Sequence, residues 1–412
     1  MRWGVEVANE LVDAFRDGWV DHPLQLAGAV VGSDGIATAG DTDLLFEIGS
    51  ITKTMTATLL ALAVVDGTAA LDDPVSRWLD AGPNGDITLL QLATHTSGLP
   101  RLAPTHQEAV ADPEDPYAAF AAAHAEAGLR EAERSDIGSQ AYSNFGFQLL
   151  GLVVERIAGV PYDELIRREL FDPFGMTTAR MTGFDGPQAQ GFRSSTPVGH
   201  WHLLLPGPGG VEATAADLAA YAAGVVAPPT DRLRAAVALT SAAPLLGWAA
   251  LGDGIWHNGG TGGFHAMLAI DPAEHRAALL LVADTDLDAI DNAVAGLLRG
   301  EDPKELRPMP VDGRWGDLAL GLVPLLVERR WPELRSTMST EVGEVLTDER
   351  LDGGWDAVMV QRGGFQGATV TRVARNGAVV TVALALTFDD EPGVATLSFT
   401  AEDDRLVGLH IA

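Results

Sequence analysis

The 412-residue chain contains no cysteine, which excludes disulfide bonds, thiolate metal sites and cysteine nucleophiles. It also lacks any run of about 18 consecutive apolar residues, so a membrane-spanning helix is not expected. Its N-terminal stretch carries Glu6, Glu10 and Asp13 where a secretory signal peptide would need an uninterrupted apolar core. We therefore expect a cytoplasmic protein that does not engage a membrane.

Positive charge is scarce as well. Asp and Glu number 57 against 27 Lys and Arg, which gives a formal net charge of −30. Only two of the basic residues are lysines, Lys53 and Lys304. An acidic surface repels nucleic acid and anionic lipid, so neither is an expected partner. The expected partner is a small-molecule or peptide substrate, and nothing in the sequence specifies an oligomeric state.

The order of patterns along the chain predicts a sheet formed from its two ends, with a helical insert between them. Amphipathic spacing over 5–17 predicts a helix, and residues 25–40 read as two short strands around a turn. A long alanine-rich helical section follows. The strand pattern returns at 252–286, and a last helix is expected at about 287–299. One antiparallel sheet covered by helices is the economical architecture.

Residues 300–313 are charged, contain three prolines and break every period, as in a linker between domains. We expect a first domain at 1–299 and a second at 314–412. The second begins with helical segments and ends in a β-meander, which predicts a small α+β domain. Its strands are expected at 367–374, 378–388, 394–400 and 406–411.

One of the two lysines follows a serine at the start of an apolar helix. Ser50 is expected at the helix N-terminus, with Lys53 on the same face. A serine hydroxyl becomes a nucleophile when a neighbouring base takes its proton, and an amine whose pKa is lowered by burial can be that base. With 13 serines and two lysines in the chain, chance predicts roughly 0.06 Ser-x-x-Lys pairs. This favours a functional pair over a capping serine and a surface lysine.

Two further motifs contain groups that can work with this pair. Tyr142-Ser143-Asn144 precedes another apolar helix, where a phenol can relay a proton and an amide can bind a substrate carbonyl. A buried tyrosine and a helix-capping asparagine explain this motif equally well. His257-Asn258-Gly259-Gly260 would let a substrate approach the backbone, and an N–H there could pair with that of Ser50 as an oxyanion hole. A plain glycine-rich hairpin is the alternative.

Together and in this order, the three motifs resemble the serine β-lactamase and penicillin-binding-protein superfamily, in particular its class C β-lactamase, D-amino-acid peptidase and esterase branch. The segments LLQLATHTSGLP (89–100), LFDPFGMTTAR (170–180) and GPGGVEATAADLAAY (207–221) are also similar to that family. The likeness covers about residues 5–299. It implies a β-lactamase-like α/β fold, with an antiparallel sheet flanked by helices, an all-α subdomain and the site between them. It implies no cofactor and no metal.

By this resemblance, Ser50 is the nucleophile, Lys53 its activator and Tyr142 the proton shuttle. The implied reaction is acylation of Ser50, followed by transfer of the acyl group to water or an amine. The first hypothesis is a serine hydrolase of esters or amides, of the esterase or D-amino-acid peptidase type. One alternative is an acyl-transferase or peptide cyclase of penicillin-binding-protein type in secondary metabolism. Another is a β-lactam-recognising protein that does not turn over.

The resemblance also implies substrate-binding roles for Asn144, His257, Gly259 and Gly260. Asn144 would contact both the substrate and the lysine, and the Gly260 N–H would complete the oxyanion hole. His257 takes the third-motif position that lysine holds in the penicillinases. Since a histidine replaces a permanent cation there, efficient β-lactamase activity is not expected.

Other histidines and tryptophans are expected to be structural. His95 lies in a segment that is mainly structural in the family. His200 and His202 have no acidic residue close in sequence, which disfavours a metal site. Trp201 and Trp256 are expected to pack rather than to contact substrate.

Overall fold

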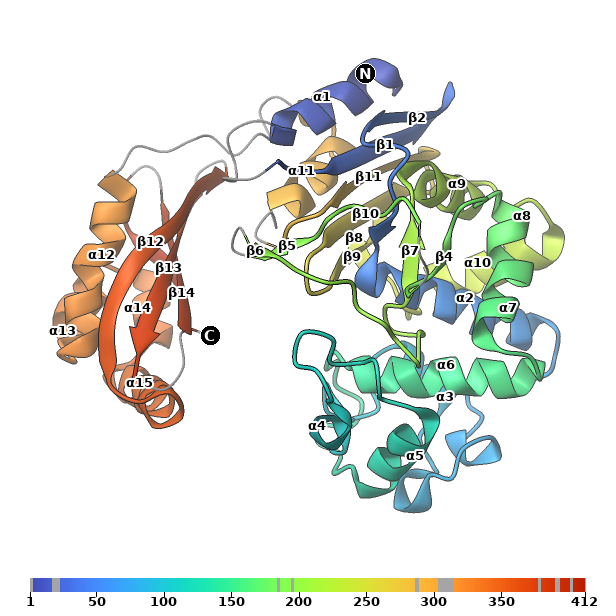
Figure 1. The fold of residues 1–412 in the computed structure, drawn as a ribbon, viewed down its shortest axis with the longest axis horizontal. Helices are drawn as coiled ribbons and strands as arrows, with labels where there is room; N and C mark the ends of the chain where they lie inside the picture. The colour runs from blue at the N-terminus through green and yellow to red at the C-terminus, as the bar shows by residue number, and fades with distance from the viewer. Residues whose placement is uncertain are drawn as a thin grey trace. The chain divides into compact units, whose positions relative to one another are not determined.

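The computed structural model describes residues 3–16, 23–183, 186–193, 196–285, 289–302, 314–376, 379–389, 393–400 and 403–411. The chain divides into two compact units, Met1–Glu305 and Leu306–Ala412 (Figure 1). The boundary falls inside the proline-containing stretch 300–313. Each unit has its own hydrophobic core. No helix among the described residues combines the length and the apolar character needed to cross a bilayer.

The first unit is built on a six-stranded sheet in the order β2-β1-β11-β10-β9-β8. Every pairing in it is antiparallel, and the N-terminal hairpin lies beside strands from the end of the unit. The strands are β1 (Leu26–Gly32), β2 (Gly35–Gly40), β8 (Ala249–Leu251), β9 (Gly254–Gly260), β10 (His265–Asp271) and β11 (Arg276–Val282). The expected fold class is confirmed, because strands from the two ends of the domain form one antiparallel sheet.

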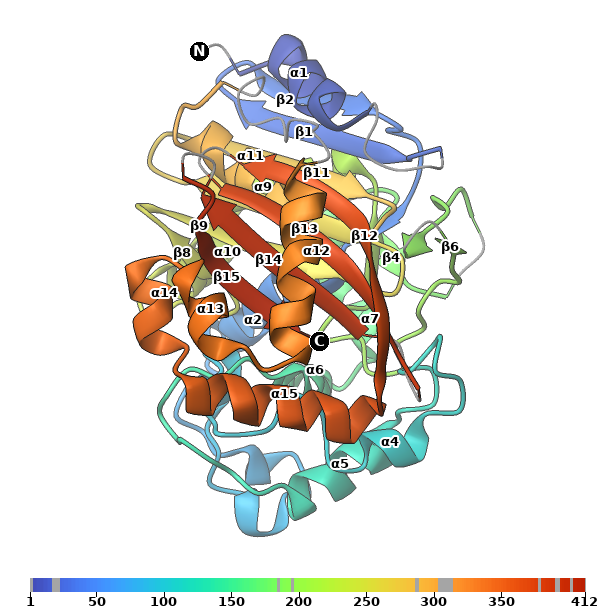
Figure 2. The same ribbon diagram turned by 90° about the vertical axis from the view of Figure 1, so that its left-hand side faces the viewer.

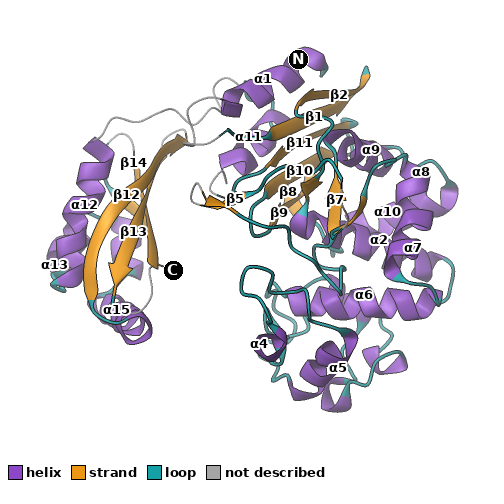
Figure 3. Cartoon of the chain, in the orientation of Figure 1, coloured by secondary structure: helices purple, strands orange, loops and turns teal. Residues whose placement is uncertain are grey.

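Helices cover both faces of this sheet. Helices α1 (Val5–Arg16) and α11 (Ala289–Leu298) contact one face, and α9 (Ala215–Val226) contacts the other (Figure 3). Six consecutive residues of β1 are buried, because side chains that point to either face meet a helix. The alternation of polar and apolar residues that marks a half-exposed strand is therefore absent from the central strands.

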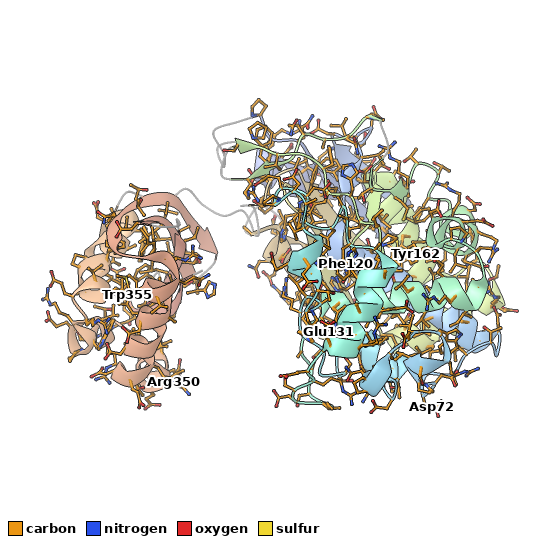
Figure 4. The ribbon with its side chains drawn as sticks, turned by 60° about the horizontal axis from the view of Figure 1, so that its bottom comes forward. Asp72, Phe120, Glu131, Tyr162, Arg350 and Trp355 are labelled. Atoms are coloured by element: carbon orange, nitrogen blue, oxygen red, sulfur yellow. The ribbon has the colours of Figure 1, made fainter. Side chains whose placement is uncertain are left out.

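The helical insert packs around α2 (Thr52–Val65), which is buried over most of its length. Helices α6 and α10 contact it, and its threonine hydroxyls are paired within the core. The Thr56 hydroxyl, for example, lies 2.7 Å from the hydroxyl of Tyr162, a residue labelled in Figure 4. The other helices between β2 and β8, apart from α9, are α3 (Leu89–Ala93), α4 (His106–Ala109), α5 (Ala122–Glu131), α6 (Asn144–Ala158), α7 (Tyr162–Ile166), α8 (Asp172–Phe174) and α10 (Asp231–Ser241).

The second unit is a four-stranded antiparallel sheet in sequential order, with helices on one face (Figure 2). Alternate residues of β13 are buried, as expected for a strand with one covered face. On the covered side, Trp355 of α15 lies with its ring centroid 6.3 Å from that of Phe388 (Figure 4). The elements are α12 (Arg314–Val327), α13 (Trp331–Ser336), α14 (Thr340–Val345), α15 (Asp348–Arg362), β12 (Phe365–Asn376), β13 (Val379–Phe388), β14 (Gly393–Thr400) and β15 (Leu406–Ile411).

Because the two cores are separate, we predict that damage to one leaves the other intact. Leu384 is fully buried in the second core, so Leu384→Ala should lower the free energy of unfolding of that unit by about 2–5 kcal/mol. Differential scanning calorimetry should show one transition shifted and the transition of the first unit unchanged. Thr387→Ala, on the exposed side of the same strand, is the control. A shift of every transition in the Leu384 variant would contradict the prediction.

Candidate active site

The Ser50 side chain lies one turn before the buried helix. Gly49–Ile51 form a single 3-10 turn, and α2 begins at Thr52 without a side-chain cap. This turn leads straight into the helix, so Ser50 and Lys53 remain on one face. The Lys53 Nζ atom lies 2.9 Å from Ser50 Oγ. The spacing in the sequence thus corresponds to direct contact between the two groups.

Glycines allow the Ser50 turn to pack against the end of β9. Gly49 has a φ of +49°, and a Cβ on it would lie 2.7 Å from the Gly260 nitrogen. A Cβ on Gly259 would lie 1.9 Å from the Ile48 carbonyl oxygen and 2.9 Å from the Ser50 nitrogen. Ser50, Gly259 and Gly260 line the same cavity. The backbone amides expected to form the oxyanion hole therefore lie on two segments in contact.

Lys53 is fully buried, and its surroundings favour the neutral amine. Its Nζ donates a hydrogen bond of 2.7 Å to the Pro208 carbonyl oxygen. Burial, and then the positive charge of Arg101, hold the pKa of Lys53 well below its ordinary value. A neutral amine that donates to Pro208 keeps its lone pair for the Ser50 hydroxyl proton, as a general base requires.

Tyr142 is placed to relay a proton rather than to remove one. Its ring centroid lies 4.9 Å from Lys53 Nζ. The residue as a whole is 36% exposed. Desolvation of its hydroxyl nevertheless raises the pKa of that group to about 12, and a hydrogen bond with Ser50 lowers the pKa by a smaller amount. The phenol is therefore protonated at neutral pH. The opposite pKa shifts of the two groups favour Lys53 as the base, a choice that the sequence left open.

His95 holds the segment that carries Tyr142. Its Nδ1 accepts a hydrogen bond of 3.1 Å from the Ser143 N–H, so the proton of the neutral ring is on Nε2. Its ring centroid lies 4.6 Å from that of Tyr142. Burial lowers the pKa of His95 to about 3, with smaller effects from Lys53 and His257. His95 is thus a positioning residue, in keeping with the structural role expected for it.

The side chain of Asn144 lies beside Ser50 but not on the lysine. Its Nδ2 donates to the Tyr117 hydroxyl at 3.4 Å, and its buried Oδ1 has no partner among the described residues. The hydrogen bonds found for Lys53 go to Ser50 and Pro208, so the expected contact between Asn144 and the lysine is not formed. Ser143, rather than Asn144, caps α6. The Asn144 side chain lines the cavity that Ser50 lines, although its Oδ1 is buried.

His257 is a neighbour of Tyr142, and the centroids of the two rings are 6.4 Å apart. Burial, and then the charge of Lys53, lower the pKa of His257 to about 4, which outweighs the raising effect of its hydrogen bond with the Asn258 carbonyl. His257 is therefore neutral at physiological pH and supplies no positive charge for a substrate carboxylate.

Two cavities meet at Tyr142 and Asn258, which line both of them. The first, of about 410 Å³, contains Ser50 and the β9 glycines. The second, of about 180 Å³, contains His95 and His257. Other residues also line the cavities, and the sequence did not indicate this role for them. They include Arg101, Leu102, Tyr117 and Trp201 in the first cavity, and Trp248 and Trp256 in the second. Trp201 and Trp256 were expected only to pack, and their exposed ring surfaces are evident only from the fold.

A second polar cluster supports the loop that carries Trp201. Glu47 Oε1 accepts a hydrogen bond of 3.1 Å from the Trp201 N–H and lies 2.8 Å from His200 Nδ1. Glu47 of β3 (Phe46–Glu47) pairs in register with Glu212 of β7 (Val211–Ala213). Arg180 forms an ion pair with Glu212, with Nε 3.0 Å from Oε2. Ligand atoms of Glu47, His200 and Glu212 lie within 4.8 Å of one another, although no acid is near His200 in the sequence. Protein groups contact all three residues, and Glu47 Oε2 is buried without a hydrogen-bond partner among the described residues.

Comparisons with known proteins place the first unit in a family. The family model described as Beta-lactamase matches residues 26–300. The D-alanyl-D-alanine-carboxypeptidase/endopeptidase AmpH of Escherichia coli K12 is 30% identical over 242 residues, which cover 52% of this chain and 60% of AmpH, less than two thirds of that relative. Penicillin-binding protein 4 of Amycolatopsis lactamdurans is 28% identical over 349 residues, covering 73% of this chain and 89% of the relative.

A solved structure described as a beta-lactamase/D-alanine carboxypeptidase from Pseudomonas syringae superposes with a TM-score of 0.58 at 19% identity. The match covers 67% of this chain and 94% of that one. A class C beta lactamase from Rhodobacter sphaeroides gives a TM-score of 0.57 at 22% identity, with 67% and 94% covered. At these identities the likeness is one of fold.

We predict that replacing Lys53 with arginine abolishes most activity. Arginine stays protonated and cannot become the neutral base, so turnover of a chromogenic ester should fall by about 10²–10⁴-fold. In the wild-type protein, kcat/KM should rise with pH through the lowered pKa of Lys53, because the amine is protonated below that pKa and neutral above it. A pH–rate profile measures both effects. Lys304→Arg is the control, and a Lys53→Arg variant as active as this control would refute the role of the amine.

A methyl group on Gly259 should separate β9 from the Ser50 turn. Because the new Cβ would lie 1.9 Å from a backbone oxygen, Gly259→Ala must shift one of the two segments. Loss of one oxyanion donor typically costs about 10²–10³ in kcat, and we expect a loss of this size. Gly199→Ala, whose added methyl would have nothing within 4 Å, should retain activity. Equal kcat values for the two variants would show that the contact is not needed.

Proposed function

The chain belongs to the beta-lactamase family, and we propose that it is a serine hydrolase that forms an acyl-enzyme on Ser50. The observation that carries the proposal is the buried Lys53 amine at 2.9 Å from Ser50 Oγ, beside a cavity large enough for a substrate. A solvent-exposed lysine would be protonated at neutral pH and could not accept the serine proton. Burial of this side chain is therefore the feature that distinguishes a catalytic pair from a surface pair.

The proposed cycle uses groups of this chain alone. Lys53 Nζ takes the proton of Ser50 as Oγ attacks the substrate carbonyl carbon. The backbone N–H groups of Ser50 and Gly260 stabilise the negative charge that develops on the carbonyl oxygen. Tyr142 delivers a proton to the leaving group as its bond to the acyl carbon breaks. Lys53 then passes the proton that it took from Ser50 to Tyr142, which restores both groups. In the second half, Lys53 takes a proton from water as the water oxygen attacks the acyl carbon, and Tyr142 gives its proton to Ser50 Oγ as the bond between Oγ and the acyl carbon breaks. Lys53 again reprotonates Tyr142.

The proposed substrate is an ester or amide, with D-amino-acid peptides included. Two relatives are a D-alanyl-D-alanine-carboxypeptidase/endopeptidase and a penicillin-binding protein, which supports a peptide or related acyl donor. His257 is neutral, so the wall that it forms supplies no cation for the carboxylate of a β-lactam. Efficient β-lactam hydrolysis is therefore disfavoured relative to ester or peptide cleavage.

Mass spectrometry tests the proposal directly. We expect incubation with penicillin or with an activated ester of D-alanine to add the acyl mass to the peptide that carries Ser50. The Ser50→Ala variant should show neither the adduct nor ester turnover. A label on another residue, or full turnover by Ser50→Ala, would refute the proposal.

The same experiment separates the alternatives, since all of them begin with acylation of Ser50. A hydrolase releases the free acid, whereas an acyl-transferase or cyclase passes the acyl group to an added amine in preference to water. A binding protein that does not turn over retains the adduct. The ratio of amide to acid products, and the lifetime of the adduct, decide among them.

A further inference from the structure

The cavity beside Ser50 contains a single formal charge. Arg101 is the only charged residue among its described lining residues, which also include the β9 glycines. None of the described residues that line either this cavity or the adjoining one is an aspartate or a glutamate. In a chain with 57 acidic residues, the two cavities are thus lined by one cation and by no described acid.

Arg101 is exposed, and among the described residues its guanidinium has neither an ion pair nor a hydrogen bond. Each of the other arginines that the structure describes in the first unit has an ion pair or a side-chain hydrogen bond to another protein group. For the Arg101 guanidinium no such partner is found among the described residues. Its central carbon lies 5.3 Å from the ring centroid of Tyr142, which places the charge close to the reacting groups.

The two cavities correspond to the two halves of a substrate. The acyl carbon must lie next to Ser50 and Gly260, which line the 410 Å³ cavity and a small adjoining one of about 30 Å³ but not the 180 Å³ cavity. The leaving group departs beside the proton donor Tyr142, toward the 180 Å³ cavity that Tyr142 shares and that Trp248 and Trp256 line. Arg101 therefore lines the cavity that holds the acyl carbon and does not line the 180 Å³ cavity.

We propose that Arg101 binds a carboxylate on the acyl half of the substrate. This inference rests on the proposed acyl-enzyme function and narrows its substrate class to acyl donors with an anionic acyl group and an uncharged leaving group. A guanidinium presents paired N–H donors that match the two oxygens of a carboxylate. Tyr117 lines the same cavity and offers a hydroxyl donor to the same anion.

Three matched 4-nitrophenyl esters test the proposal. Their acyl groups are (4-carboxyphenyl)acetyl, (4-carbamoylphenyl)acetyl and (4-aminomethylphenyl)acetyl, which differ in charge and cannot cyclise onto their own ester. We expect the wild-type protein to hydrolyse the carboxylate ester with a kcat/KM about tenfold above that of the neutral amide, the size of a charge-assisted contact at an exposed site. Added salt should reduce this preference.

Variants at Arg101 should change the ratio in a defined direction. Arg101→Gln should bring the ratio of carboxylate to amide ester close to one, and Arg101→Glu should favour the aminomethyl ester. The ratio is the informative quantity, because Arg101 also lowers the pKa of Lys53 and its loss alters turnover of every ester. Arg130→Gln, which removes a surface ion pair with Asp80, should leave the ratio as in the wild type.

The results of this experiment distinguish a failure of the Arg101 inference from a failure of the proposed function. Ester turnover that depends on Ser50 but shows no charge preference, or a preference unchanged in Arg101→Gln, overturns the Arg101 inference and leaves the proposed function standing. Turnover that persists in Ser50→Ala, or no turnover of any of the three esters, overturns the proposed function and this inference with it.

Discussion

The structure of the first unit depends on keeping one amine uncharged. Lys53 is fully buried, and removal of a charged ammonium from water is costly, so the folded state favours the neutral form. Between this lowered pKa and the ordinary pKa of an unfolded lysine, the unfolded chain binds the extra proton. The free energy of unfolding therefore rises with pH across that window, and at neutral pH the reactive amine lowers stability. This cost is the physical reason to regard the position as functional.

The remainder of the site consists of segments brought to this amine from distant parts of the chain. Pro208 accepts its hydrogen bond across a sequence separation of 155 residues. The β9 glycines reach the Ser50 turn because β9 is next to the edge strand of the sheet, and a side chain on Gly259 would collide with that turn. His95 fixes the segment that carries Tyr142 from a third region. The fold thus brings together five segments, and the contact at Gly259 leaves no room for an added atom.

Local chemistry could be predicted from the sequence, whereas the walls of the cavities could not. Helical spacing put Ser50 and Lys53 in contact, and two apolar runs around a turn gave the hairpin of β10 and β11, because both depend on neighbours in the chain. The β12–β15 meander followed from period-two patterns in the same way. Cavity walls depend instead on the distance between segments that no short-range pattern encodes, so the exposed faces of Arg101 and Trp201 were found only in the structure.

The distribution of acidic residues follows from the same requirement for a neutral lysine. A carboxylate near Lys53 would stabilise the ammonium form and raise its pKa, which would remove the base. In the described part of the first unit, the buried acids near the site are engaged elsewhere, as in the contact of Glu47 with His200 and of Glu212 with Arg180. An anionic substrate would introduce the charge that the cleft excludes. A cation on the cavity wall offsets that charge, so Arg101 both lowers the pKa of Lys53 before binding and limits its rise when an anion enters.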